Sequence, residues 1–504
     1  MHIMHPDVKG ARVIFAKKFF HRKAAFAKLA NASIIKHWRV RPIFGITCEV
    51  WFVMQERSTL MTEGSAWRHI VRFALPIFWG NLFQQLYNVV DSLVVGNFLG
   101  SDALAAVGSS GSLVFLLVGL FSGIFTGASV VISRYFGARD EASMRVAVHT
   151  TVAFGLIAGV TMTALGTWLT PHMLRWMGTP PSVLPNSILY FRIYFSGVIF
   201  VVLYNTSNGI FQAVGDSRHP LYYLILSSIT NVVLDLLFVA VLHMGVDGAA
   251  LATVISQAVS AFLGFYRLTH TTGAYRVFPR KVRINGPMLR QVLTMGIPSG
   301  VQNSIIAIAN VIVQSSINLY GATAVAGCGS YSKIEGFAFL PITSFALALS
   351  TFVGQNLGAK QYARAREGAR FGITAALVLA ECIGLAFYAL APYLIRLFSS
   401  DAQVIAYGVL QARTCSVFYC LLAFSHAVAG VMRGAGRAIV PMLVMLVCWC
   451  VIRVSYIMLV ARASDNIRMI FWAYPLTWSL SSIAFLVYYL KADWPHYLDQ
   501  KALF

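Results

Sequence analysis

The chain has 504 residues, of which 58% are hydrophobic and only 11% are charged, and its formal net charge is +21. Soluble domains carry about 25% charged residues, and a soluble chain this apolar would expose large hydrophobic patches, so the composition excludes a soluble globular protein. The Lys and Arg residues stand between apolar runs, which argues against nucleic-acid binding and for loops at an anionic membrane surface.

Residues 1–60 form a basic extension that contains eleven Lys or Arg residues and three acidic residues. The stretch 14–35 mixes Phe and Lys in a way that allows a basic amphipathic helix on a membrane surface. A second interpretation is that translation starts at Met61, which opens a short polar segment before the first apolar run. We favour the second interpretation, in which residues 1–60 are dispensable.

Twelve apolar runs follow, and each approaches the roughly 20 residues that a membrane-spanning helix needs. They are predicted at 73–95, 105–130, 147–169, 187–209, 220–243, 248–268, 292–318, 324–353, 371–394, 404–428, 438–461 and 469–490. The fold class is therefore an all-α membrane protein with twelve transmembrane helices.

Basic residues concentrate in alternate loops, for example at Arg134 and Arg139, in the long loop 269–290, and at Lys360 and Arg364. The opposite set of loops holds few cations. The positive-inside rule places the basic loops and both termini in the cytoplasm. We expect a multi-pass protein of the inner (cytoplasmic) membrane.

The sequence repeats itself at a spacing of 221 residues. GSDALAAVG from Gly100 corresponds to GATAVAGCG from Gly321, and Gly137-Ala-Arg corresponds to Gly358-Ala-Lys. Each half holds an even number of spans, so both halves insert in the same orientation. This pattern predicts two pseudo-symmetric six-helix lobes around a central cavity, the arrangement that alternating access requires.

The repeat and the charge pattern divide the chain into five segments. These are a basic extension (1–60), an N-lobe with spans 1 to 6 (61–268), a basic cytoplasmic linker (269–290), a C-lobe with spans 7 to 12 (291–490) and a cytoplasmic tail (491–504).

Acidic residues inside predicted spans are rare and are candidates for function because a buried charge is expensive. Asp91 in span 1 has Tyr87 one helical turn before it, and Asp235 in span 5 has Asn231 in the same relation. Thr253 in span 6 offers another oxygen. These hard oxygen donors suit a proton or Na⁺ and not a soft metal ion.

Two further acids lie in the second half. Glu335 in span 8 could meet a cationic substrate in the cavity or could brace neighbouring helices, and the sequence does not separate these alternatives. Lys333 stands two residues away on a different helix face, so the two are not an obvious ion pair. Glu381 in span 9 is interpreted as structural or lipid-facing.

No Walker motif, nucleophile elbow or cluster of metal ligands occurs in the sequence. We therefore expect a protein that is not an enzyme, does not use ATP directly and binds no cofactor apart from a coupling ion, H⁺ or Na⁺.

The chain resembles the multidrug and toxic compound extrusion (MATE) family from about Trp67 to Leu490. The resemblance rests on Pro76 with Asn88-Val-Val-Asp91, on the two Gly-Ala-Arg/Lys segments, on GIFQAVGD from Gly209 to Asp216 and on Asn231-Val-Val-Leu-Asp235. It implies twelve helices in two lobes and antiport of organic compounds against H⁺ or Na⁺.

In the branch of the family with a cation site in the N-lobe, the resemblance places the coupling acids at Asp91 and Asp235. The polar groups that accompany them match Tyr87, Asn205, Asn231 and Thr253. Another branch has acids on helices 7 and 10 of the C-lobe. Spans 7 and 10 have no acid here, so the sequence favours an ion site in the N-lobe alone.

These observations predict a secondary active multidrug efflux antiporter that works by alternating access as a monomer on small amphipathic substrates in a lipid bilayer. The first alternative is a flippase for lipid-linked precursors, which the small number of predicted cations inside the membrane disfavours. The second alternative is a receptor or scaffold without transport activity.

Overall fold

The structure, a computed structural model, describes residues 60–100, 103, 111–176, 179–181, 183–461, 463–464 and 466–497, all within one compact unit, Ser58–Phe504. The predicted basic extension lies outside the described residues except for Leu60, as does the second half of the predicted tail, 498–504. Every element in the described part of the chain is helical.

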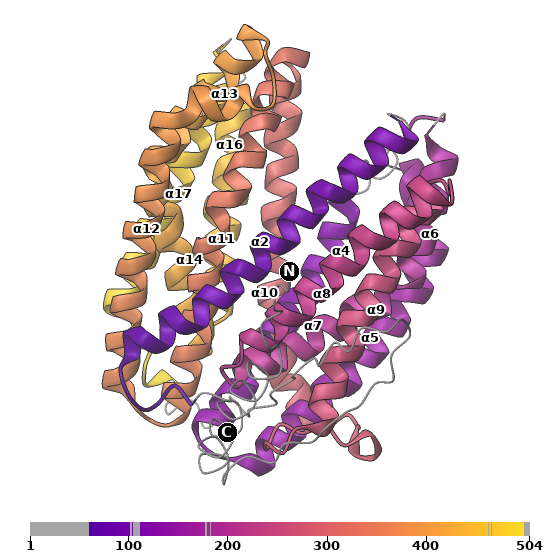
Figure 1. The fold of residues 1–504 in the computed structure, drawn as a ribbon. Coiled ribbons are helices and arrows are strands. Elements are labelled where there is room, and N and C mark those ends of the chain that lie inside the picture. Colours follow the sequence, from indigo (N-terminus) through magenta and orange to yellow (C-terminus); the bar gives the residue numbers. More distant parts are fainter. Residues whose placement is uncertain are drawn as a thin grey trace, which may run out of the picture. The chain divides into compact units, whose positions relative to one another are not determined.

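The first six spans form the N-lobe (Figure 1). Its elements are α2 (Ala66–Leu99), α4 (Gly111–Gly137), α5 (Glu141–Trp176), α6 (Leu184–Ser196), α7 (Val198–Ala213), α8 (Arg218–Asp235), the π-helical segment η1 (Leu236–Val241) and α9 (Val246–His270). Between the lobes lies a short 3-10 turn, η2 (Pro279–Lys281).

The last six spans form the C-lobe. Its elements are α10 (Gly286–Asn318), α11 (Ala322–Gly358), α12 (Tyr362–Arg396), α13 (Ala402–Cys415), η3 (Ser416–Phe418), α14 (Tyr419–Gly434), α15 (Ile439–Met445), η4 (Leu446–Ile452), α16 (Arg453–Tyr456), η5 (Ile457–Ala461) and α17 (Arg468–Lys491). The predicted fold class, twelve helices in two pseudo-symmetric lobes, is confirmed.

Ten spans in the described part of the chain are long and apolar enough to cross a membrane, and an eleventh is the pair α6 and α7, bent by 45°. The twelfth, α2, has 34 residues but is less apolar because it carries Asn81, Gln84, Gln85, Asn88 and Asp91. A polar helix in a membrane must turn its polar face toward protein or water, so α2 is the first place to look for a site.

Two predicted spans are interrupted. Span 4 breaks at Gly197, where a Cβ atom would collide with the side chain of Val254 on α9. The glycine lets the two helices approach closely, and the bend follows from the missing side chain. Span 10 likewise consists of α13, η3 and α14. An apolar run does not reveal such breaks, because composition does not record local geometry.

The backbone repeats with the sequence. Three pairs of residues 221 positions apart share positive φ angles: Gly100 and Gly321 (85° and 91°), Arg139 and Lys360 (56° and 57°), and Gly215 and Gly436 (78° and 84°). The π-helical segments η1 and η5 also begin 221 positions apart, at Leu236 and Ile457. Left-handed residues and π turns are uncommon in helical proteins, so their recurrence shows that the duplication extends to the chain path.

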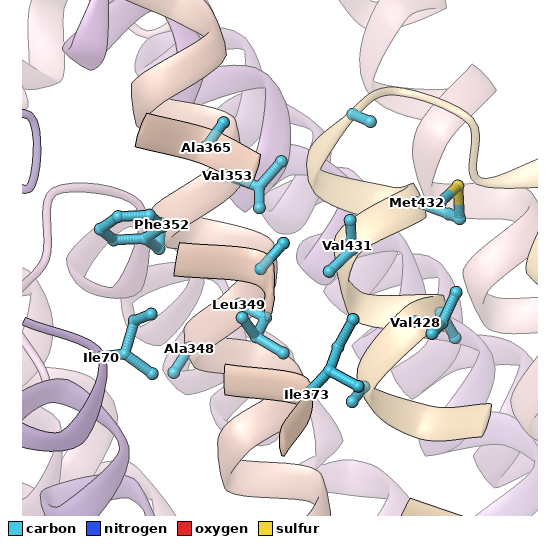
Figure 2. Close-up of a cluster of buried hydrophobic side chains, with 14 of the residues drawn as sticks. Ile70, Ala348, Leu349, Phe352, Val353, Ala365, Ile373, Val428, Val431 and Met432 are labelled. Atoms are coloured by element: carbon cyan, nitrogen blue, oxygen red, sulfur yellow. The ribbon is translucent and has the colours of Figure 1, made fainter. Parts of the chain in front are cut away.

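Helices α2 and α10 each belong to both lobes, and we call them the crossing helices. Early residues of α2, such as Ile70, pack into the C-lobe core beside Leu349 and Phe352 of α11 (Figure 2). Late residues Val94 and Val95 pack into an N-lobe core instead.

The second crossing helix behaves in the same way with the lobes exchanged. Met288 and Val292 of α10 pack among N-lobe residues, whereas Val313 and Ile317 pack in the C-lobe. The pseudo-two-fold relation thus governs the packing as well as the chain path.

The two lobes meet closely at the end of the molecule that carries Arg134, Arg139, Lys360 and Arg364, which we call the basic end. A Cβ atom on Gly137 of α4 would collide with the backbone of Gln355 on α11. Its repeat partner Gly358 would collide in the same way with the backbone of Arg134. Only glycine permits such an approach, so this reciprocal pair brings α4 and α11 into backbone contact.

A strap formed by residues 60–65 crosses the basic end. The amide of Met61 donates to Gln355 Oε1 at 2.9 Å, and Gln355 Nε2 donates to the carbonyl of Ala213 in the N-lobe at 2.8 Å. Glu63 pairs with Arg139 at 2.6 Å. Arg364 donates to the carbonyl of Gly64 at 2.6 Å. The strap therefore joins both lobes in this conformation.

The predicted linker folds onto the N-lobe. The amide of Phe278 donates to His149 Nε2 at 3.0 Å, and the amide of Asn285 donates to Thr150 Oγ1 at 3.3 Å. These bonds fix the start of α10 against α5.

Candidate cation and substrate sites

Asp91 and Asp235 stand on helices that pack against each other in the N-lobe. Asp91 lies in the last third of α2, and Asp235 is the last residue of α8, directly before the π-helical segment η1. The side chain of Asp235 is fully buried, whereas Asp91 is partly exposed. Single π turns occur often at functional sites because they turn side chains out of the regular helical register.

The structure brings the two carboxyl groups together. Each carboxyl group is among the neighbouring groups that act electrostatically on the other. Both Oδ atoms of Asp235 and Oδ1 of Asp91 nevertheless lack a hydrogen-bond donor within the described part of the chain. Buried carboxylate oxygens normally accept hydrogen bonds, and leaving them without a partner is costly. The arrangement is what a site for an exchangeable cation requires.

Hydroxyl groups surround this acid pair. Tyr87, one turn before Asp91 on α2, interacts with both carboxyl groups and with the side chains of Gln84 and Gln257. Tyr190 on α6 is buried and interacts electrostatically with Asp91 and Asp235. Tyr194 and Tyr204 interact electrostatically with Tyr87. The site is thus rich in neutral oxygen atoms.

Asn231 lies one helical turn before Asp235 on α8 and is 1% exposed. Neither its Oδ1 nor its Nδ2 has a hydrogen-bond partner among the described residues. A buried carboxamide without partners is unusual, since its burial is otherwise uncompensated. Asn231 is therefore a candidate ligand beside the acid pair.

The structure records different contacts for Asn205 and Thr253. Asn205 Nδ2 donates to the carbonyl of Val201 at 2.8 Å, and Thr253 Oγ1 donates to the carbonyl of Ala249 at 3.1 Å. Both bonds lie within the residue's own helix, α7 or α9. The oxygen Oδ1 of Asn205 and the lone pairs of Thr253 remain possible acceptors, and their part in the site stays a prediction.

Gln257 and the tyrosines Tyr190, Tyr194 and Tyr204 are absent from the set predicted from the sequence. Gln257 lies four residues after Thr253, on the same face of α9, so helical spacing could have identified it. The tyrosines stand in an aromatic stretch and carried no comparable signal, since aromatic residues are common in membrane helices.

A small pocket with both apolar and polar groups in its wall lies between α2, α7 and α8 on the basic-end side of the acid pair. It encloses about 320 Å³ including its mouth, and Asn81, Tyr204, Asn208 and Gln212 contribute polar groups to its wall. Asn81 precedes Asp91 by ten residues, about 15 Å along a helix. Tyr204, in the wall of the pocket, also interacts electrostatically with Tyr87 of the acid-pair site.

Glu335 belongs to a polar network within the C-lobe. Tyr331 Oη donates to Glu335 Oε1 at 3.1 Å and lies 3.0 Å from the hydroxyl of Tyr419 on α14. Lys333 points elsewhere, with its Nζ 5.5 Å from the ring centre of Phe398. The prediction that Lys333 and Glu335 lie on different faces is confirmed.

Arg453 is the functional candidate that sequence reasoning missed. It lies in the eleventh span, is 1% exposed and interacts electrostatically with Glu335. A single Arg within an apolar run is a signal that can be read, but its partner stands 118 positions earlier in the sequence. Glu381 instead accepts a hydrogen bond from the amide of Cys420 at 3.2 Å, in agreement with a structural role.

No group of three or more His, Cys, Asp or Glu residues that could hold a metal ion occurs in the part of the chain that the structure describes. The acid pair offers two carboxylates and neutral oxygens, a donor set that suits H⁺ or Na⁺.

This chain is similar in sequence to a family of known membrane proteins. The MatE family model matches the chain twice, at residues 76–237 and 298–459. The "Probable multidrug resistance protein YpnP" of Bacillus subtilis is 29% identical over 86% of this chain and 97% of its own length. A "FAD transporter" of Shewanella oneidensis is 24% identical over 87% of this chain and 96% of its own length.

Solved structures of related transporters superpose on this chain over most of their length. A multidrug resistance MATE family transporter of the MOP superfamily, in an outward-facing conformation, superposes with a TM-score of 0.82 at 26% identity and covers 87% of this chain and 98% of its own. A MOP superfamily transporter from Pyrococcus furiosus superposes with a TM-score of 0.81 at 26% identity and covers 89% and 99%.

Proposed function

Because this chain belongs to the MatE family of multidrug efflux transporters, we propose that it exports organic, often cationic, compounds in exchange for H⁺ or Na⁺. The observation that carries the proposal is the buried pair Asp91 and Asp235, whose oxygens lack hydrogen-bond donors among the described residues. Two neighbouring carboxylates in an apolar lobe repel each other and are poorly solvated, so the pair binds a cation readily.

Cation binding can change the shape of the N-lobe because the pair bridges two helices. Without a bound cation, repulsion favours separation of α2 from α8; with one, the carboxyl groups can approach. The crossing helix α2 also contacts the C-lobe core through Ile70, so a movement at Asp91 reaches the contact between the lobes. Coupling requires that cation and cargo stabilise different states of the lobes.

The basic end is closed in this structure, and we place that end in the cytoplasm of a cell with this protein in its inner membrane. The positive-inside rule supports this orientation, with both termini cytoplasmic. The conformation is then closed toward the cytoplasm. Alternating access follows if the lobes separate at Gly137 and Gly358 while the opposite end closes.

Glu335 is the proposed substrate contact in the C-lobe. Glu335 is partly exposed as a residue, and its carboxyl group accepts a hydrogen bond from the hydroxyl of Tyr331, so it can attract a cationic group of a bound compound. We propose that the transporter acts as a monomer, because each lobe is complete within one chain.

The test uses everted membrane vesicles that contain wild-type protein, Asp91→Asn or Asp235→Asn. Ethidium transport driven by a pH gradient or by a Na⁺ gradient, each applied separately, should fall in both variants to the level of vesicles without the protein. Each variant removes one of the two charges that hold the cation, while the amide keeps the side-chain shape.

Asp247→Asn is the matched control. Asp247 lies in the first turn of α9 and is not among the groups that act on Asp91 or Asp235, so this variant should transport at the wild-type rate. Wild-type transport in both Asp91→Asn and Asp235→Asn, at equal protein levels, would remove the proposed role of the pair. The gradient that drives transport identifies the ion.

A panel that includes ethidium, FAD and a lipid-linked precursor separates the substrate classes. Transport of ethidium supports drug efflux, and transport of the lipid-linked precursor alone would favour the flippase alternative. Absence of transport for every compound, in protein that is correctly inserted, would favour a receptor or scaffold.

A further inference from the structure

The linker between the lobes is fixed to the N-lobe by buried side chains. Tyr275 and Val277 are buried and belong to the same hydrophobic core as Leu268 of α9. The amide of Val277 donates to the carbonyl of Leu268 at 2.8 Å. Together with the bonds from Phe278 and Asn285 to α5, these contacts give the linker one defined path along the surface of the N-lobe.

The exposed side chains of the linker carry positive charge. Four cations, which we call the basic platform, are exposed: Arg276, Arg280, Lys281 and Arg283. None of the ion pairs in the described part of the chain involves them. The sequence has no Asp or Glu between Asp247 and Glu335, so the linker brings no acidic residue of its own. The platform is therefore positively charged and open to an anion from outside the chain.

Two of these cations are held beside one aromatic ring. Arg276 Cζ lies 5.0 Å and Lys281 Nζ lies 5.3 Å from the ring centre of Phe278. That ring is stacked against the ring of His149 on α5, with 6.2 Å between the ring centres. Arg276 Nε also donates to the carbonyl of Thr269 in the last turn of α9 at 2.9 Å. Like charges that are held close together repel each other, and an anion that contacts both relieves the repulsion.

The height of the linker along α5 places the platform at the edge of the hydrocarbon layer. The linker bonds to His149 and Thr150, which follow the start of α5 at Glu141 by eight and nine residues, or about 12–14 Å. The apolar run predicted for this helix starts at residue 147. Exposed cations at this height lie level with the phosphate groups of the lipids.

An exposed apolar stripe on α9 leads to the platform. Ile255, Phe262 and Tyr266 are exposed and are spaced by seven and four residues, so they share one face of the helix. The stripe ends in the turn whose Thr269 carbonyl accepts the bond from Arg276. An apolar face that runs up to a group of cations matches a molecule with a hydrocarbon chain and an anionic head group.

The repeat shows that this arrangement is not a general requirement for inserting a lobe into a membrane. At the spacing of 221 residues, the platform corresponds to Tyr497, Lys501, Ala502 and Phe504, which include one cation instead of four. Close to that segment, Arg366 pairs with Asp493 at 3.5 Å. Both lobes have the same predicted orientation in the membrane, so the excess of unpaired cations is a property of the N-lobe alone.

We propose that the basic platform and the apolar stripe of α9 form a binding site for an anionic phospholipid of the cytoplasmic leaflet. The phosphate group of the lipid contacts the platform, and one acyl chain lies along the stripe. The inference rests on the orientation given in the proposed function, because the cytoplasmic leaflet carries the anionic lipids. Asn285 of the same linker caps α10, so a bound lipid also steadies the start of this crossing helix against α5.

The experiment measures lipid retention by native mass spectrometry of purified full-length protein. The protein is incubated in detergent with equal amounts of phosphatidylglycerol and phosphatidylethanolamine that have identical acyl chains. Wild-type protein should retain phosphatidylglycerol in several-fold excess. The variant with Arg276→Gln, Arg280→Gln, Lys281→Gln and Arg283→Gln should retain the two lipids about equally, because the platform has lost its charge.

A second variant with the same loss of charge is the matched control. Lys360→Gln, Arg366→Gln, Arg370→Gln and Lys491→Gln remove four exposed cations of the C-lobe at the basic end. This control should keep the wild-type preference for phosphatidylglycerol. An equal loss of preference in both variants would mean that net charge alone attracts the lipid, and this would overturn the proposed site.

A photoactivatable phosphatidylglycerol with a diazirine on one acyl chain locates the bound lipid. Peptide mass spectrometry of wild-type protein should find cross-links on α9 near Phe262, and these should be lost in the platform variant. Cross-links that are spread over the lipid-facing helices, and that are equal in both proteins, would refute the site. This comparison stays informative if the platform variant has a lower melting temperature, because it reports position.

A soluble anion separates the phospholipid from its head group. Glycerol 3-phosphate in large excess should leave the retained phosphatidylglycerol in place, because it has no acyl chain to occupy the stripe. Displacement of the lipid by this small anion would show that the stripe contributes nothing, which contradicts the proposal. None of these measurements depends on ethidium transport by the Asp91 and Asp235 variants, so the two proposals fail separately.

Discussion

Asp140 stands directly before α5, and its Oδ1 accepts a hydrogen bond from the amide of Ser143 at 3.0 Å. This is the capping arrangement that satisfies a free amide in the first turn of a helix. At the same position of the repeat, Gln361 precedes α12 and provides no side-chain cap. Its buried Oε1 has no hydrogen-bond partner among the described residues. The two lobes therefore offer the same helix start with and without a cap.

We expect Asp140→Ala to lower the stability of the protein by about 1 kcal/mol, the usual value of such a cap, and Gln361→Asp to raise it by a similar amount. Hydrogen bonds from Ser143 hold the pKa of Asp140 below its ordinary value of 3.8. A lowered pKa means that the contribution is present at neutral pH and is lost as the pH falls through the lowered value. Melting temperatures in detergent at neutral pH measure both changes.

Asp140→Asn is the control for charge, because Asn also caps helices well. Asp140→Asn should therefore lose less stability than Asp140→Ala. If Gln361→Asp lowered the melting temperature, the cap would not be what distinguishes these two positions.

The residues of the site divide into those that a sequence can reveal and those that it cannot. Asp91 and Asp235 were predicted because an acid within an apolar run is rare, and the structure brings them together. Tyr190 on α6 interacts electrostatically with the pair, and Gln257 on α9 interacts with Tyr87. Neither type of residue is rare enough in such helices to mark a site. Arg453 was visible as a lone cation, but its relation to Glu335 depends on how α11 and α16 pack.

Between helices, α4 and α11 form the close contact at the basic end that the proposed movement of the lobes would have to open. Gly137 and Gly358 allow their backbones to touch, and each glycine faces the helix that carries the other. Because this contact is backbone to backbone, no flexible side chain could give way to an added methyl group. The contact is therefore sensitive to a single carbon atom.

We predict that Gly137→Ala or Gly358→Ala prevents closure of the basic end and shifts the population toward states that are open there. Spin labels at Ala142 and Ala363, which are exposed and 221 positions apart, report the separation of the lobes by double electron–electron resonance. Each variant, in a cysteine-free background, should lengthen the mean distance between the labels.

Gly329→Ala is the matched control, since it lies on α11 and a Cβ there has no neighbour within 4 Å. This variant should leave the distance unchanged. An unaltered distance in Gly137→Ala would show that the lobes adapt to the methyl group without opening.

The helices also show where sequence reasoning stops. All twelve spans were predicted, but α4 continues to Gly137 and α5 extends from Glu141 to Trp176, beyond the predicted ends at residues 130 and 169. Apolar composition reports the part of a helix that lies in hydrocarbon, and these helices continue into more polar surroundings. The bend at Gly197 was missed because a glycine within an apolar run has the same composition whether the helix breaks or not.

Across the whole molecule, two kinds of contact join the lobes through the strap, and their strengths differ. Glu63 and Arg139 form an ion pair whose side chains are 71% and 70% exposed. Such pairs contribute about 0–1 kcal/mol. Gln355 is fully buried and joins the strap to the N-lobe with two hydrogen bonds.

Removing Gln355 should therefore matter more than removing the ion pair. We expect Gln355→Ala to lose about 1–3 kcal/mol from the closed state, because it leaves the amide of Met61 and the carbonyl of Ala213 without partners. The distance between labels at Ala142 and Ala363 should shift toward open values in Gln355→Ala and stay near the wild-type distribution in Glu63→Gln. The opposite ranking would mean that exposed charges, and not the buried amide, hold the strap.

The crossing helices have a consequence for the origin of this architecture. The first turns of α2 pack into the core of the C-lobe, and the first turns of α10 pack into the core of the N-lobe. Neither half of the chain therefore contains a complete hydrophobic core. A single copy of the repeat would expose to solvent or lipid the first turns of its first helix. It would also lack the helix that completes its own core. Two such copies, side by side and inserted in the same direction, would each complete the core of the other with their first helix. Fusion of two such copies into one chain would join two halves that already need each other to bury their first helices.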